Sequence, residues 1–234
     1  MPAWQAVYGG YTLNIGAEYQ SVMTGDAINR GDIFTEDFRA LPATQLVWGS
    51  VLGGGSFNNY YASLFFTNKS NDADRLYLAG LAQARLKYSA YLVHGRLMRP
   101  PTLINSSLPL SRLARPTPSK ANPKIMAACM IEQPAMQLWQ ANGATAGTVG
   151  LAVVNFAVSP VDFNVSVDVS SLFTELGDEI GEVVRARVLG GPDGDGVWGE
   201  LAVEGGDGEG RVALQNRLAP LSVAIIEVAR ATRE

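Results

Sequence analysis

The chain contains one histidine and one cysteine, so few reactions could depend on either side chain. A histidine metal site or a Ser–His–Asp triad would have to use His94. His94 stands directly before Gly95 at the predicted end of a helix, where an imidazole can cap carbonyl groups, and we favour this structural role. Cys129 lies in the apolar run 125–131 without an apparent activating base, which favours packing as a small hydrophobic residue.

Two glycine-rich segments could bind ions. The run Gly-Gly-Gly-Ser at 53–56 could hold a phosphate through backbone N–H groups, but it lacks the lysine of a P-loop, so we favour a flexible loop. Asp193 and Asp195 could bind calcium, but they do not match an EF-hand loop, so we favour a solvated hairpin. The sequence therefore predicts no metal site and no cofactor.

The composition favours a folded protein that does not bind nucleic acid. Of its 234 residues, 47% are hydrophobic and 17% are charged, which is enough apolar material for a core. A net charge of −4 gives no attraction for nucleic acid or an anionic membrane. We expect no secretory signal in this chain and no membrane span, although sequons at Asn68, Asn105 and Asn164 would fit a secreted parent protein. The compartment stays open.

Residues 1–98 are predicted to be α/β. Continuous apolar runs at 3–8 and 45–50 are typical of buried parallel strands. Glu36 and Asp37 look like the first turn of a helix. The segment 72–94 is the clearest helix, and Gly95 would end it. This helix is apolar over most of its circumference, so we expect neighbours on two of its sides.

Residues 99–124 are predicted to be a proline-rich connector without regular structure, and residues 125–234 an antiparallel β-sandwich. The segment 161–169 alternates strictly between apolar and polar residues, as a half-buried strand does. Further strands are predicted at 125–132, 135–140, 148–156, 182–189, 197–204, 210–215 and 222–228.

Five segments carry a resemblance to a known architecture. They are Trp-Gln-Ala-Val-Tyr-Gly-Gly-Tyr at 4–11, Gln-Leu-Val-Trp-Gly at 45–49, His-Gly-Arg-Leu-Met-Arg-Pro-Pro at 94–101, and the strand segments 150–155 and 218–223. With them the chain resembles the C-terminal part of glycoside-hydrolase-type TIM-barrel proteins with an appended β-sandwich, a domain-of-unknown-function family of α-galactosidase-like architecture. The resemblance implies the last two βα units of an incomplete barrel, without roughly the first six of eight.

The resemblance also implies where a sugar would lie. Barrel active sites form at the carboxyl ends of the strands, aromatic rings stack on sugar faces, and amides bind hydroxyl groups. The residues for carbohydrate contact are therefore Tyr8, Tyr11, Trp48, Asn58, Asn59 and Tyr60. The alternative is that Tyr8 and Trp48 pack in a core and that Asn58 and Asn59 form a turn.

No catalytic residue can be assigned. Glycoside hydrolysis needs two carboxyl groups roughly 5–10 Å apart, and the family's carboxylates stand on earlier strands. The acids near the presumed face are Glu18, Asp26, Asp32, Glu36 and Asp37, and their spacing defines no pair.

Two hypotheses follow. The first is the C-terminal portion of a glycoside-hydrolase-like protein, not catalytic alone. The second is a non-catalytic carbohydrate-binding or structural sandwich module. A lone barrel fragment would expose strand edges, so self-association through that edge is a further expectation.

Overall fold

The computed structural model describes residues 36–50, 72–104, 110–112, 130–132, 134–142, 147–172, 183–189, 199–203 and 210–230. The helices are α3 (Glu36–Val47), α5 (Asp72–Lys87), α6 (Ser89–Leu92) and the 3-10 turn η4 (Ser170–Leu172). The strands are β1 (Arg96–Leu97), β2 (Thr102–Leu103), β3 (Leu110–Arg112), β4 (Met130–Glu132), β5 (Ala135–Gln140), β6 (Thr148–Asn155), β7 (Val161–Asp168), β8 (Val183–Leu189), β9 (Gly199–Ala202), β10 (Arg211–Leu218) and β11 (Ser222–Arg230).

Two antiparallel sheets form a β-sandwich. A six-stranded sheet has the order β1-β5-β6-β11-β8-β9, and a three-stranded sheet has the order β10-β7-β2. Every second residue of β7, from Val161 to Val167, is buried and faces the larger sheet, while its other residues are more exposed. This alternation follows directly from the period of two along a strand. The predicted antiparallel sandwich is therefore confirmed.

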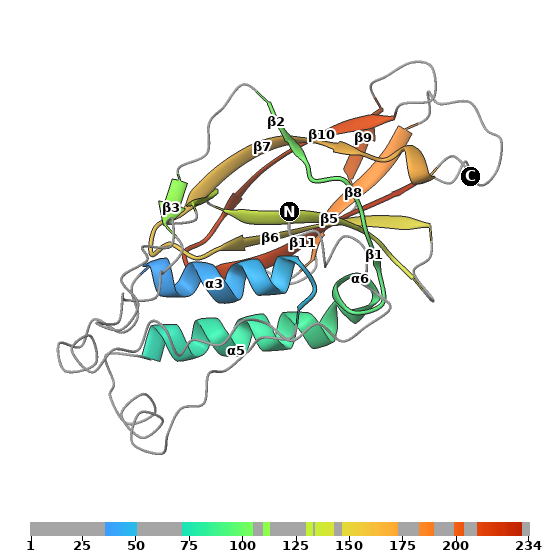
Figure 1. Ribbon diagram of the computed structural model, residues 1–234. Helices are drawn as coiled ribbons and strands as arrows, with labels where there is room; N and C mark the ends of the chain where they lie inside the picture. The colour runs from blue at the N-terminus through green and yellow to red at the C-terminus, as the bar shows by residue number, and fades with distance from the viewer. Residues whose placement is uncertain are drawn as a thin grey trace, which may run out of the picture.

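The larger sheet is covered on its second face by the helices, which gives three layers (Figure 1). A separate core joins α3, α5 and α6 to this face, and it contains Leu46, Leu81 and Leu92 from the helices and Trp139 and Ile225 from the strands. Because both faces of the sheet are buried, its central strand β6 is apolar without alternation.

The prediction of a barrel strand at 45–50 is wrong. Residues 45–47 are the last turn of α3, which begins at Glu36 as the acidic pair there suggested. A short apolar run buried on all sides looks the same in a strand and in a helix, so periodicity could not separate them. The other predicted barrel strand, 3–8, lies outside the described residues.

The predicted helix at 72–94 is confirmed, with a break at Tyr88 that separates α5 from α6. Gly95 follows α6 and donates its N–H to the carbonyl of Tyr91 at 3.0 Å. A Cβ at this position would lie 2.3 Å from the Tyr91 carbonyl oxygen, so only glycine fits. The described helices include none long and apolar enough to span a membrane.

The proline-rich stretch contains two short strands, which corrects the prediction that it lacks regular structure. Thr102 and Leu103 form β2 directly after Pro101, and pair with β7. Leu110 begins β3 directly after Pro109, and this strand pairs with β4. Pro101 lies before the first residue of β2, where its missing N–H interrupts no ladder.

Candidate functional site

Trp48 is the one predicted sugar-contact residue within the described part of the chain. It caps the carboxyl end of α3, is half-buried, and packs against the core between helices and sheet. Tyr8, Tyr11, Asn58, Asn59 and Tyr60 lie outside the described residues. The proposed cluster of six thus remains a prediction.

The end of α3 is a Schellman motif. Gly49 has a φ of 72° and donates its N–H to Leu46 at 2.9 Å, while Ser50 donates to Gln45 at 2.9 Å. These two bonds satisfy carbonyls that the helix leaves without partners. A Cβ on Gly49 would also lie 2.7 Å from the Trp139 ring. Gly49 therefore ends the helix at a fixed place and determines where Trp48 stands.

Two side chains from other elements bind the same helix end. The indole Nε1 of Trp139 donates to the carbonyl of Val47 at 2.9 Å. The Nη1 of Arg85 donates to the carbonyls of Gly49 at 2.8 Å and Leu92 at 3.1 Å. Burial lowers the pKa of Arg85 from its ordinary value, while the two carbonyls give its positive charge hydrogen-bond acceptors. The backbone carbonyls on both sides of Trp48 therefore accept hydrogen bonds from side chains of other elements.

A buried polar cluster lies where α6 meets the larger sheet. Glu227 of β11 is only 3% exposed. Tyr91 donates its hydroxyl hydrogen to Glu227 Oε1 at 2.5 Å and lies 2.7 Å from Thr148 Oγ1, which can donate to it. Arg187 binds Glu227 Oε2 through Nε at 2.7 Å and through Nη2 at 2.6 Å. Burial, followed by the hydrogen bond to Glu227, raises the pKa of Tyr91 well above its ordinary value of 10.0.

Gly150 makes room for this cluster. It stands between Trp139 of β5 and Glu227 of β11 in the sheet register. A Cβ on Gly150 would lie 2.7 Å from the Tyr91 ring, so the missing side chain lets this ring reach the sheet. Both oxygens of Glu227 are already bonded, and the cluster therefore attaches α6 to the sheet rather than offering a free acid or base.

The other carboxylates whose side chains the structure describes also have partners. Asp74 lies 2.5 Å from Arg39 Nε, and Asp72 pairs with Arg75. Further along the chain, Asp168 accepts a hydrogen bond from the Ser170 N–H, and Asp162 lies 3.9 Å from Arg217.

Within the described ranges, no group of three or more histidine, cysteine and acidic residues could hold a metal ion. His94 is exposed after α6, and its backbone N–H donates to Ser89.

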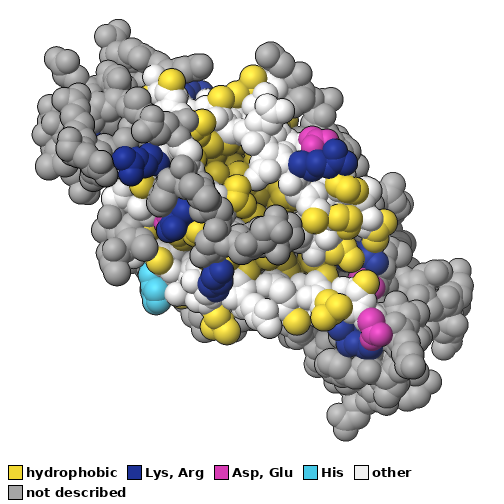
Figure 2. Space-filling view, turned by 180° about the vertical axis from the view of Figure 1, so that it is seen from behind, with side chains coloured by type: hydrophobic (Ala, Val, Ile, Leu, Met, Phe, Trp, Pro, Cys, Tyr) yellow, Lys and Arg dark blue, Asp and Glu magenta, His cyan; other side chains and the backbone are white. Residues whose placement is uncertain are grey.

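A hollow of about 280 Å³ opens between β8, β9 and β10. Val188, Leu201 and Ile226 line it, as do Gln215 and Asn216 of β10. Gln215 is exposed, and Oδ1 of Asn216 accepts the N–H of Arg217 at 2.7 Å. Apart from this hollow, the face of the molecule opposite to the view of Figure 1 has hydrophobic side chains in its middle (Figure 2). The hollow between β8, β9 and β10 could hold a small ligand with an apolar surface.

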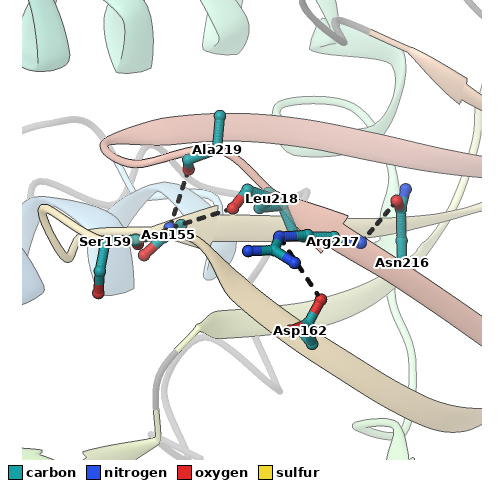
Figure 3. A network of polar contacts seen from close by, with 7 residues as sticks. All are labelled: Asn155, Ser159, Asp162, Asn216, Arg217, Leu218 and Ala219. Carbon is teal, nitrogen blue, oxygen red and sulfur yellow. Dashed lines mark hydrogen bonds and ion pairs between the residues drawn. The ribbon is translucent and has the colours of Figure 1, made fainter.

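Asn155 fixes the turns at one end of the sandwich (Figure 3). It is fully buried, and its Nδ2 donates to the carbonyls of Ser159 and Ala219, each at 2.8 Å. Its Oδ1 accepts the N–H of Ala157 at 3.0 Å. This amide therefore joins the β6–β7 and β10–β11 turns, and we assign it a structural role.

The sequence analysis did not identify the residues that bind the end of α3 or those of the buried cluster around Glu227. Tyr91 and Glu227 are 136 positions apart, so no local pattern could pair them. A signal did exist, since Glu227 is the only acid in β11 and lies between apolar residues on both sides, and a buried acid of this kind needs a partner.

No family model and no curated protein matches the chain. Among solved structures it is similar to a GH27 β-L-arabinopyranosidase from Geobacillus stearothermophilus, at 15% identity and a TM-score of 0.32 over 86% of this chain and 32% of that one. It is similar to α-galactosidase I from Mortierella vinacea, at 10% identity and a TM-score of 0.34 over 88% and 39%. It is also similar to an Anoxybacillus α-amylase, at 14% identity and a TM-score of 0.35, over 93% of this chain and 38% of that one. The likeness is coarse, and the chain spans between 32% and 39% of the length of these structures.

Proposed function

We propose that this chain is the C-terminal portion of a glycoside-hydrolase-like, carbohydrate-active protein and is not catalytic alone. The residues before β1 would be the end of an incomplete TIM barrel, without the strand predicted at 45–50, which is the end of α3. The sandwich would include β1 and β2, which stand within the ranges predicted as the barrel fragment (1–98) and the connector (99–124), besides the predicted sandwich residues 125–234. Tyr8, Tyr11, Trp48, Asn58, Asn59 and Tyr60 would contact the sugar, and the catalytic carboxylates would stand elsewhere in a longer chain.

The core shared between the helices and the larger sheet carries this proposal. A tethered binding module would present a solvated sheet face, whereas here that face packs on α3, α5 and α6. The buried contact between Tyr91 and Glu227 adds a specific attachment. A sandwich packed in this way supports a neighbouring helical layer, which is the role proposed for it.

Trp48 supports the sugar-contact part of the proposal. It is half-buried at the end of α3, and the carbonyls of its neighbours Val47 and Gly49 accept hydrogen bonds from Trp139 and Arg85. An indole at such a place could serve as a platform for a sugar ring.

The hollow beside β10 favours a second candidate function, a non-catalytic carbohydrate-binding module. Its apolar walls could face a sugar ring, and the amides of Gln215 and Asn216 could bind hydroxyl groups.

A glycan array, followed by titration of the sugars retained, separates the two functions. Loss of binding in Trp48→Ala, with Asn216→Ala unchanged, would support the first. The reverse pattern would support the second, and retention of no sugar by the wild-type chain would contradict sugar binding by either route.

An immunoblot of source cells tests whether the chain is a portion of a longer protein. A band well above the 24.9 kDa of this chain is expected. A band at that mass would contradict the first proposal and favour the binding module.

A further inference from the structure

The hollow between β8, β9 and β10 exists because the two sheets of the sandwich differ in width. The larger sheet has six strands and the smaller sheet has three, with β10 at one edge of the smaller sheet. The inner faces of β8 and β9 are therefore only partly covered. Ala186, Val188 and Leu201 pack against the sandwich core, yet each of them is only half-buried.

Two small residues leave room inside the hollow. Ala186 of β8 and Gly199 of β9 are partners in the sheet register, so they stand on the same face of the sheet. A Cβ on Gly199 would meet nothing nearer than the Ala186 carbonyl oxygen, at 3.9 Å. Leu214 and Ile226 line the same hollow with larger side chains. About 280 Å³ with apolar walls therefore stays open at a place where protein interiors are usually close-packed.

Of the residues that line the hollow, Asn216 has a polar side chain on the inner face of its sheet. Val212, Leu214 and Leu218 of β10 are buried in the sandwich core, and the period of two along a strand places Asn216 on their face. Oδ1 of Asn216 accepts the N–H of Arg217 at 2.7 Å, whereas Nδ2 has no partner among the described residues. Asn216 therefore offers its N–H groups to a ligand.

The other polar residues of the lining belong to other faces. Gln215 is exposed and stands on the outer face of β10. The guanidinium of Arg187 binds Glu227, which also binds Tyr91 of α6, so this charge lies on the helical face of the larger sheet. The remaining lining residues are uncharged. A ligand in the hollow therefore gains no ion pair from the residues that line it.

We propose that the hollow binds a small, neutral, apolar molecule that carries one hydrogen-bond acceptor, such as an aryl ketone. Its apolar part packs between the two sheets, and its acceptor binds Nδ2 of Asn216. A cavity of about 150 Å³ is enough for benzene, so about 280 Å³ has room for a substituted ring.

This ligand differs from the sugar of the second candidate function. A sugar ring carries a hydroxyl group on most of its carbons and needs more partners than one amide on the inner face supplies. The inference does not depend on sugar contact at Trp48.

Titration of the 234-residue chain with acetophenone, followed in two-dimensional amide NMR spectra, tests the proposal. The wild type should show saturable shifts for the amides of Ala186, Gly199 and Leu201. Gly199→Leu should weaken binding at least about tenfold, because its side chain enters the hollow at a place where a Cβ has room. Gly80→Leu is the matched control. A Cβ at Gly80 meets nothing within 4 Å, but this residue lies in α5, so the variant should bind as the wild type does.

Two comparisons test the chemical class of the ligand. Asn216→Leu should weaken the binding of acetophenone about three- to tenfold and leave unchanged the binding of ethylbenzene, which has no acceptor. Benzoate, which is charged, should bind the wild type less tightly than acetophenone does, because the hollow would desolvate its carboxylate without an ion pair.

Absence of saturable shifts in the lining, or equal binding by Gly199→Leu and the wild type, would overturn the proposal. An equal loss of both ligands in Asn216→Leu would overturn the role of the acceptor, and tighter binding of benzoate would overturn the neutral class. Displacement of acetophenone by a sugar retained on the glycan array would overturn it in favour of the second candidate function. The NMR spectrum of each free variant shows whether it is folded.

Discussion

At the scale of single residues, the contact between helices and sheet depends on positions where adding or removing a single side-chain atom would disturb the packing. Gly150, Tyr91 and Glu227 meet at one point, where a missing side chain, an aromatic ring and a buried charge are fitted together. Interiors of this density tolerate little added volume, so substitutions here should have large effects.

Gly150→Ala should lower the free energy of unfolding by about 2 kcal/mol, because the new Cβ would overlap the Tyr91 ring. Gly80→Ala is the matched control. Its Cβ meets nothing within 4 Å, and alanine in a helix should stabilise the protein by about 0.5–1 kcal/mol. Urea unfolding measures both, and equal effects from the two substitutions would contradict the close fit at Gly150.

Tyr91 should make the stability fall at alkaline pH. Its pKa is raised in the folded state, so the folded protein keeps this proton longer than the unfolded chain does. The resulting stabilisation is complete below the ordinary tyrosine pKa of 10.0 and is lost progressively above it. The difference in unfolding free energy between the wild type and Tyr91→Phe should therefore stay constant up to about pH 9 and shift against the wild type between pH 10 and 11. A difference that stays constant up to pH 11 would contradict a raised pKa for Tyr91.

At the scale of elements, the position of α3 depends on how its carboxyl end is bound. Trp139→Phe removes the donor to the Val47 carbonyl but keeps an aromatic ring in the core, and it should cost about 1–3 kcal/mol. Trp48→Phe makes the same change at the half-buried neighbour and should cost less. Thermal unfolding compares them, and a larger loss from Trp48→Phe would contradict the assigned role of Trp139.

The strands of the sandwich could be predicted because each carries its own local signal. In β7 the alternation of apolar with polar residues indicates both the strand and its buried face. Around α3 the local signal was ambiguous, since Leu46 and Val47 are buried as they would be in a strand, and Gly49 ends either element. The site depends on contacts between distant segments, such as Trp139 with Val47, 92 positions apart, which no single-sequence pattern contains.

At the scale of the whole molecule, the helical layer and the two sheets form one cooperative unit if the core between the helices and the larger sheet stabilises both. Trp139, Ala152 and Ile225 face the helices, while Leu151 and Ile226 next to them face the smaller sheet. The same central strands therefore contribute to both cores, and loss of the helical layer would expose an apolar sheet face to water. We expect the helices and the sandwich to unfold together.

Native-state hydrogen exchange, followed by mass spectrometry of peptides from α3, α5, β6 and β11, tests this central claim most directly. If helices and sheet form one cooperative unit, the slowest amides of α3 and α5 should open with the same free energy as those of β6 and β11, and denaturant should affect them equally. If the helical amides exchange through a separate opening of several kcal/mol lower free energy, with the sheet still protected, the shared core does not unite the layers and the account is contradicted.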